Sequence, residues 1–131
     1  MKTITTWKKE FEFESKQEHN AINLDGNKKN GFGPKALLLS GLAGCSGVDV
    51  VDILEKMRIK FSSLKIDSEA TLAEDHPKIF KEIRLTYKIK TDKNNEEKVI
   101  KAIDLSLEKY CGVSAMLKKN SPISYKLIIE S

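Results

Sequence analysis

The chain has 131 residues, of which 40% are hydrophobic and 32% are charged, a balance typical of a folded domain and too apolar for a disordered chain. The net charge is +4, from 23 basic and 19 acidic residues, and every basic residue except Arg58 and Arg84 is a lysine. Nucleic-acid binding needs a clustered basic face with stacking aromatic rings or arginine forks. The composition therefore favours a lysine-rich solvated surface, and only the pI near 9.0 points toward RNA.

Signals for export, for membrane insertion and for disulfide formation are missing from the sequence. The opening residues, MKTITTWKKEFEFES, contain no apolar stretch like that of a signal peptide. The longest uncharged run, residues 36–48, is too short to cross a bilayer. Two cysteines, Cys45 and Cys111, do not make the disulfide framework of a secreted domain. We therefore expect one cytoplasmic domain over residues 1–131, with reduced thiols and no membrane contact.

The first 25 residues alternate between apolar and polar side chains as β-strands do. Ile4 and Thr6 share one face of the first segment, and Phe11 and Phe13 share one face of the second. HNAINLD, residues 19–25, predicts a third short strand, and the three strands should pair as a meander. The glycine- and asparagine-rich segment 25–33 is a loop by composition.

A long helix is predicted from Ala36 to about Lys60, with Pro34 in its first turn. Its first half is apolar on all sides and should be buried on every side. Its second half is amphipathic, with four inward positions: Val50, Ile53, Leu54 and Met57.

Two alternating strands follow at 64–74 and 78–91, joined by a turn at 75–77. Inward positions of the second strand are Ile79, Ile83, Leu85, Tyr87 and Ile89. A second helix begins near Asn94 with Asp92 or Asn94 as its cap, and Gly112 should break or redirect it. ISYKLIIE, residues 123–130, closes the chain as a strand. The order βββαββαβ predicts an α+β fold in which sheet packs on two long helices.

Two familiar motifs match only in form. GFGPKA, residues 31–36, has the spacing of a dinucleotide fingerprint, but no buried strand precedes it and Pro34 removes a phosphate-facing amide. His19, His76 and the two cysteines show none of the short spacings that zinc ligands usually have. We therefore expect neither a bound cofactor nor a metal.

The two cysteines remain as candidates for chemistry. Each lies on the buried face of one long helix, so the simplest interpretation is a pair of small core residues. If the two helices pack together, however, the thiols can meet. Cys45 also lies among Gly41, Gly44 and Gly47, and each interior glycine costs a helix about 1 kcal/mol relative to alanine. Glycines at this spacing leave room for the close approach of another backbone or of a substrate.

GPKALLLSGLAGCSGVDVV, residues 33–51, and KYCGVSAML, residues 109–117, resemble the OsmC/Ohr family of thiol-dependent peroxidases. The resemblance implies an intertwined homodimer with active sites at the subunit interface. It also implies that Cys45 reduces a hydroperoxide and becomes a sulfenic acid, that Cys111 resolves this acid to a disulfide, and that an external thiol restores both.

The sequence departs from this family at the residues that hold the first cysteine as a thiolate. Family members carry a glutamate one or two positions after the proline and an arginine in an N-terminal loop, whereas this chain has Lys35 and Ala36 and no arginine before residue 34. Lys28, Lys29, Lys35 or Arg84 are the candidate replacements. We therefore expect slow peroxide reduction that rises with pH. The alternative is a weakly catalytic or non-catalytic protein that binds a small apolar ligand in the dimer cavity.

Overall fold

The alternating N-terminal segment forms a three-stranded antiparallel sheet in the order β1 (Ile4–Lys9), β2 (Glu12–Gln17) and β3 (Asn20–Asp25). This computed structural model describes residues 1–131, in two compact units, Met1–Leu38 and Leu39–Ser131. The predicted meander is confirmed. Phe11 lies in the turn rather than on a strand with Phe13, because the chain reverses at Glu10, whose φ is 49°.

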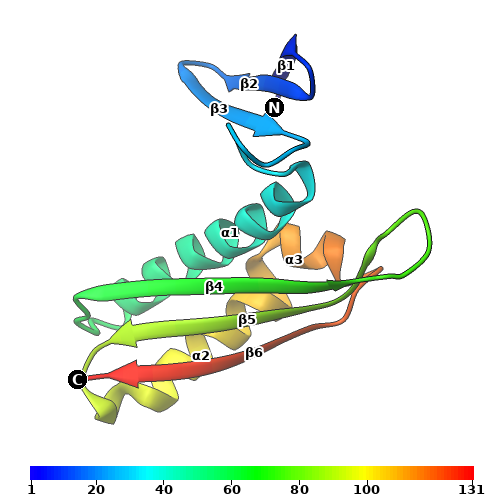
Figure 1. Ribbon diagram of the computed structural model, residues 1–131. Coiled ribbons are helices and arrows are strands. Elements are labelled where there is room, and N and C mark those ends of the chain that lie inside the picture. The colour runs from blue at the N-terminus through cyan, green and yellow to red at the C-terminus, as the bar shows by residue number, and fades with distance from the viewer. The chain divides into compact units, whose positions relative to one another are not determined.

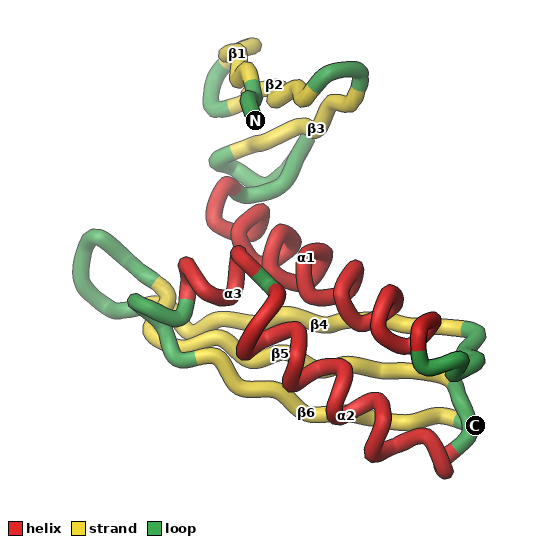
Figure 2. The backbone as a smooth tube through the Cα atoms, turned by 180° about the vertical axis from the view of Figure 1, so that it is seen from behind, coloured by secondary structure: helices red, strands yellow, loops and turns green.

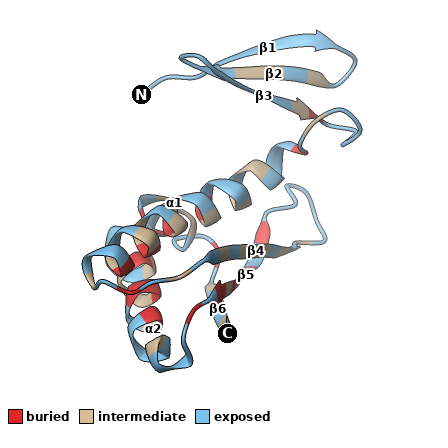
Figure 3. Cartoon of the chain, turned by 90° about the vertical axis from the view of Figure 1, so that its left-hand side faces the viewer, coloured by how far each residue is buried: buried red, intermediate tan, exposed pale blue.

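One face of this first sheet carries an apolar row across the strands. Trp7 pairs with Phe13, and Phe13 pairs with Leu24, so the three side chains point to the same side. Trp7 nevertheless remains 62% exposed, and Figure 3 shows β1 exposed along its whole length, with half-buried stretches in β2. The first unit therefore has the pattern of a half-buried sheet with its apolar row largely uncovered.

The loop after β3 is organised by the buried carboxylate of Asp25. It accepts backbone N–H groups from Asn27 at 2.8 Å, Asn30 at 3.0 Å and Lys29 at 3.2 Å. Hydrogen bonds from Asn30 and Asn27 hold the pKa of Asp25 below its usual value. The predicted loop is thus a defined turn that leads into the first helix.

Helix α1 (Pro34–Lys56) begins at the predicted proline. Its buried residues recur every fourth position, at Leu42, Ser46, Val50 and Leu54. Within the single chain the first half is covered only in part, with Val48 70% exposed, and its burial on every side stays a prediction. By length and composition α1 could also cross a membrane, because the whole helix is longer than the uncharged run 36–48 that it contains. This is weak evidence, since the core helix of a soluble protein passes the same test.

The second unit contains a sheet in the order β4 (Ser63–Leu72), β5 (Phe80–Lys90) and β6 (Ile123–Glu130). β5 pairs antiparallel with β4 and parallel with β6. The predicted inward residues of β5 are confirmed as buried at Ile83, Leu85, Tyr87 and Ile89. Ile79 is an exception and stays exposed, because β5 begins one residue later and Phe80 is buried in its place.

The second long helix is interrupted rather than continuous. Asp92 caps the short turn η1 (Lys93–Asn95), its side chain accepting the N–H of Asn94, and α2 (Glu96–Leu105) follows. A π-helical turn, η2 (Ser106–Tyr110), leads to the extended residue Cys111 and then to α3 (Gly112–Leu117). The break therefore falls at Cys111, and Gly112 begins the next helix.

Helices α1 and α2 lie on the same face of the β4–β6 sheet (Figures 1 and 2). The core between them joins side chains of all three layers, including Leu42, Val50, Tyr87, Ile103 and Cys111. The predicted α+β class and the packing of sheet on two helices are confirmed. The arrangement brings the two helical segments that carry the cysteines together.

Candidate active site

The two cysteines meet between α1 and the η2–α3 junction. Cys45 is half-buried near the middle of α1, and Cys111 is only 3% exposed. Cys45 packs against the core that contains Cys111 and lies close enough to affect the pKa of the Cys111 thiol. Burial, followed by the contact with Cys45, raises the pKa of the Cys111 thiol to about 11, although the N–H of Ser114 opposes the shift. At neutral pH Cys111 is therefore a neutral thiol facing the more accessible Cys45.

Backbone hydrogen bonds fix the orientation of Cys111. Its N–H donates to the carbonyl of Ser106 at 2.7 Å, which closes the π-helical turn. Its sulfur accepts the N–H of Ser114 at 3.3 Å. Single π-helical turns inside helices are frequent at functional sites, because the extra residue redirects the side chains that follow.

A buried polar network lies beside the thiols. The Ser46 and Tyr87 hydroxyls are 2.6 Å apart, and the Ser106 hydroxyl lies 2.9 Å from both the Ser46 hydroxyl and a carboxylate oxygen of Asp49. Burial raises the pKa of Tyr87 to about 12, against the opposing hydrogen bond from Ser46. These residues were not singled out from the sequence as site residues. Ser46 carried a usable signal, since a serine on an apolar helix stripe must find a buried partner.

The glycines around Cys45 have different surroundings. A side chain at Gly41 or Gly44 would meet nothing within 4 Å, whereas a Cβ at Gly47 would lie 3.3 Å from Ile66. A groove of about 650 Å³ runs along this side of α1, lined mostly by apolar side chains and including Gly44, Gly47 and Val48. Two of the three glycines therefore keep space open that this chain does not fill.

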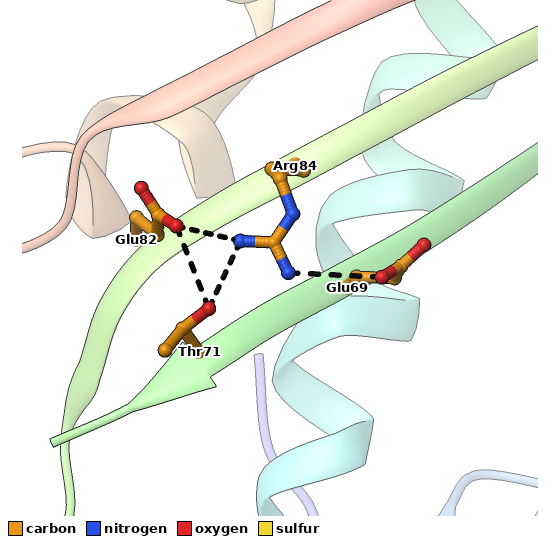
Figure 4. Close-up of polar contacts among 4 residues, drawn as sticks. All are labelled: Glu69, Thr71, Glu82 and Arg84. Carbon is orange, nitrogen blue, oxygen red and sulfur yellow. Dashed lines mark hydrogen bonds and ion pairs between the residues drawn. The ribbon is translucent and has the colours of Figure 1, made fainter.

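Arg84 does not replace the family's arginine within one chain. It alternates with Ile83 and Leu85 along β5, so its side chain lies on the sheet face opposite the helices. Figure 4 shows its guanidinium group engaged with Glu82 at 2.8 Å, Thr71 at 3.0 Å and Glu69 at 3.6 Å. This candidate is wrong for the chain's own Cys45. Lys28, Lys29 and Lys35 belong to the first unit, and their role stays a prediction.

The GFGPKA motif at residues 31–36 and the two histidines have positions in the fold that explain them without a ligand. A Cβ at Gly31 would lie 2.6 Å from the carbonyl oxygen of Asn23, so close backbone packing requires this glycine. His19 lies in the β2–β3 turn and His76 in the β4–β5 connection. No group of three metal-ligating side chains gathers anywhere in the chain.

A second hollow lies away from the cysteines. It measures about 760 Å³ and is lined by residues of the α1–β4 and β5–η1 connections, such as Phe61 and Thr91, together with Ser131. It contains no thiol and no buried titratable group. The site therefore rests on the contact between the two cysteines rather than on cavity size.

The fold and the two cysteines together indicate the family to which the protein belongs. The OsmC-like protein family model matches residues 26–126, and the chain belongs to this family. It is 33% identical over 118 residues to Protein YhfA of Escherichia coli K12, covering 88% of this chain and 87% of that protein. A crystal structure of a hypothetical protein from Aquifex aeolicus VF5 is 33% identical, with a TM-score of 0.85 and coverage of 99% and 97%.

A structure with a named activity shares the fold at lower identity. The organic hydroperoxide resistance protein OhrB of Bacillus subtilis is 18% identical, with a TM-score of 0.63 and coverage of 98% of this chain and 96% of that one. At this identity the likeness shows the fold alone. The family predicted from the two cysteine motifs is thus confirmed, and the chemistry must be argued from the residues of this chain.

Proposed function

We propose that the protein is a thiol-dependent hydroperoxide reductase in which Cys45 reduces the peroxide and Cys111 resolves the product. The observation that carries the proposal is the placement of an accessible thiol against the part of the core that holds a buried one. A buried thiol with a pKa of about 11 is a poor first nucleophile at neutral pH. Cys45 is therefore the peroxidatic cysteine and Cys111 the resolving one.

The proposed cycle has three balanced steps. The Cys45 thiolate attacks the terminal oxygen of a hydroperoxide and the O–O bond breaks, leaving a sulfenic acid on Cys45 and an alkoxide that takes one proton from water to become the alcohol. The Cys111 sulfur then displaces the sulfenic oxygen as water, which carries away the Cys111 proton, and the disulfide forms. An external dithiol reduces that disulfide and is itself oxidised. The chain needs no metal or cofactor in any of these steps.

Organic hydroperoxides are the proposed substrate class. A groove between α1 and β4, which begins at the residues just before Cys45, is lined mainly by apolar residues such as Ala43, Val48 and Val51. An alkyl substituent gains about 25 cal/mol for each Å² of apolar surface that it buries there, whereas hydrogen peroxide gains nothing. OhrB of Bacillus subtilis, which shares the fold, is named for organic hydroperoxide resistance.

A second copy of the chain is the proposed partner of the open face of α1. Side chains on this face stay exposed, with Val48 at 70%, and Gly41 and Gly44 leave room for a closely packed backbone. An obligate interface of more than about 2,000 Å² would cover such a face. In a homodimer the site lies beside the interface, and lysines of the partner's 28–35 segment are candidates to stabilise the Cys45 thiolate. We propose a cytoplasmic location, where a thiol reductant is available.

A turnover assay tests this proposal. Purified protein is mixed with tert-butyl hydroperoxide and dithiothreitol, and the loss of peroxide is followed with hydrogen peroxide as the comparison substrate. We expect catalytic consumption, faster for the organic peroxide, and none with Cys45→Ser. Consumption no faster than with dithiothreitol alone, by a folded protein, would contradict the proposal.

The apolar groove also favours a second candidate function, the binding of a small apolar ligand without turnover. A groove of about 650 Å³ lies within the range of natural ligand sites. In that case an alkyl alcohol that fills the groove binds saturably, while the protein leaves the hydroperoxide unchanged.

A further inference from the structure

Ser106 connects the segments that carry the two cysteines. Its carbonyl oxygen accepts the N–H of Cys111 at 2.7 Å. Its hydroxyl reaches across to α1, where it lies 2.9 Å from the hydroxyl and 3.4 Å from the carbonyl oxygen of Ser46, the residue after Cys45. Ser106 is completely buried. One residue therefore links the two segments: its side chain reaches Ser46, beside Cys45, and its backbone carbonyl holds the N–H of Cys111.

Asp49 sets the orientation of the Ser106 hydroxyl. The Ser106 hydroxyl has one proton and three acceptors within reach, and the carboxylate of Asp49, at 2.9 Å, is the only charged one. Hydrogen bonds to a charged acceptor are about twice as strong as neutral ones, so Asp49 selects the rotamer of Ser106. Tyr87 holds the Ser46 hydroxyl in turn, at 2.6 Å.

We propose that Ser106, oriented by Asp49, is a positioning residue that sets the Cys45–Cys111 contact. Its role in turnover rests on the proposed function, but the pairing of the thiols does not. The π-helical turn is what places Cys111, and Ser106 opens that turn. If the turn relaxed to an α-helix, the residues after it would rotate by about 100° around the axis, and the Cys111 thiol would leave Cys45.

The buried setting makes this positioning necessary. Cys111 is enclosed by the core and cannot search for its partner by moving through solvent. Disulfide formation also needs a narrow geometry, with the two Cα atoms within about 7 Å and an S–S torsion near ±90°. A displacement of about 1 Å can reduce the rate of such a reaction about a hundredfold.

The experiment measures thiol pairing without peroxide. The reduced protein is equilibrated with glutathione and its disulfide, so that the two protein thiols and one glutathione disulfide give the Cys45–Cys111 disulfide and two glutathione thiols. The equilibrium constant gives the effective concentration of one thiol toward the other. For Ser106→Ala we expect a fall of about tenfold or more. For Asp49→Asn we expect a smaller fall, since the amide oxygen still accepts the hydroxyl proton.

Ser121→Ala is the matched control. Ser121 is also a buried serine, and its hydroxyl donates at 2.7 Å to the carbonyl of Phe80. We expect this variant to lose a comparable free energy of unfolding and to keep the wild-type equilibrium constant. If Ser106→Ala does not fold, Asp49→Asn at its half-buried position carries the same test.

Two results would overturn the positioning role. One is a wild-type equilibrium constant in Ser106→Ala or, if that variant does not fold, in Asp49→Asn. The other is an equal fall in Ser121→Ala, which would make the effect one of general stability. A wild-type chain that pairs its thiols, loses this pairing in Ser106→Ala and yet leaves tert-butyl hydroperoxide unchanged would support the positioning role while removing the proposed peroxidase function.

Discussion

The segments around Cys45 and Cys111 present the same thiol in opposite settings. Cys45 lies half-buried on α1 beside glycines that leave open space. Cys111 lies in the core, where its N–H and its sulfur are both hydrogen-bonded and the pKa of its thiol is raised to about 11. The difference shows how two identical side chains can take different roles, one reacting with the substrate and the other reacting only afterwards with the first cysteine.

Access and ionisation act in the same direction in this pair. A thiol reacts as its thiolate, so the buried Cys111, whose pKa is raised to about 11, should be oxidised more slowly than the more accessible Cys45. The buried thiol is closed to solvent and can react only with a neighbouring group, which here is the sulfur of Cys45. The following predictions test this division, from the largest expected effect to the smallest.

Removing each thiol in turn should have unequal consequences. Cys45→Ser should abolish hydroperoxide consumption, because Cys111 is buried and protonated at neutral pH. Cys111→Ser should still allow a single turnover and leave a sulfenic acid on Cys45 that dimedone traps, as mass spectrometry would show. Equal loss of the first turnover in both variants would mean that the roles are assigned wrongly.

Filling the open space beside Cys45 should separate the proposed dimer. A Cβ at Gly44 meets nothing within 4 Å in its own chain, and Gly44→Leu also removes a helix-weakening glycine. Overpacking an interface costs about 1–3 kcal/mol, so the dimer should dissociate about 5- to 150-fold more readily in sedimentation equilibrium. Ser124→Leu, which adds the same side chain to the outward face of β6, is the control and should leave association unchanged. A wild-type chain that is monomeric at micromolar concentration would contradict the dimer.

Alkylation rates should differ between the two thiols across the pH range. In the Cys45→Ser background Cys111 should react very slowly at pH 8, where only about one thousandth of it is ionised. In the Cys111→Ser background the alkylation rate of Cys45 should rise toward about pH 8–9, because the family's arginine is absent. Iodoacetamide labelling followed by mass spectrometry measures both. A fast, flat Cys45 rate down to about pH 6 would show a strongly stabilised thiolate.

Alkaline pH should weaken the fold through Cys111. Its pKa of about 11 lies above that of an unfolded thiol, near 8.5, so between these values the unfolded chain releases a proton that the folded chain retains. This contribution to stability is complete below about pH 8.5 and falls as the pH rises toward 11. Urea unfolding at pH 7.5 and pH 10 should show a smaller decrease for Cys111→Ser than for wild type. An equal decrease would mean that Cys111 titrates normally.

The strands and the cysteines were predictable because both follow from local patterns. Alternation along β5 identified four buried residues, and the spacing of apolar residues placed Cys111 on an inward helix face. Ile79 was misassigned because period-two alternation does not tell where a strand begins. The family followed from the two cysteine motifs, which are short and contiguous.

The supporting residues of the site were not predictable in the same way. Ser46, Asp49, Tyr87 and Ser106 come from three elements, and no local spacing relates them. The π-helical turn adds one residue to a helix whose apolar pattern stays nearly helical, so the sequence predicted a break only at Gly112. Burial of the first half of α1 stays a prediction, because an all-apolar helix indicates burial without saying whether the same chain or a second copy covers it.

The central claim is that Cys45 and Cys111 form one redox pair, and a single-turnover thiol count tests it most directly. The reduced protein is treated with one equivalent of tert-butyl hydroperoxide under denaturant-free conditions, and free thiols are then counted after unfolding. We predict the loss of both thiols of each chain, with peptide mass spectrometry showing an intramolecular Cys45–Cys111 disulfide. Two free thiols remaining after the peroxide is added, or a disulfide that joins two different chains, would contradict the account.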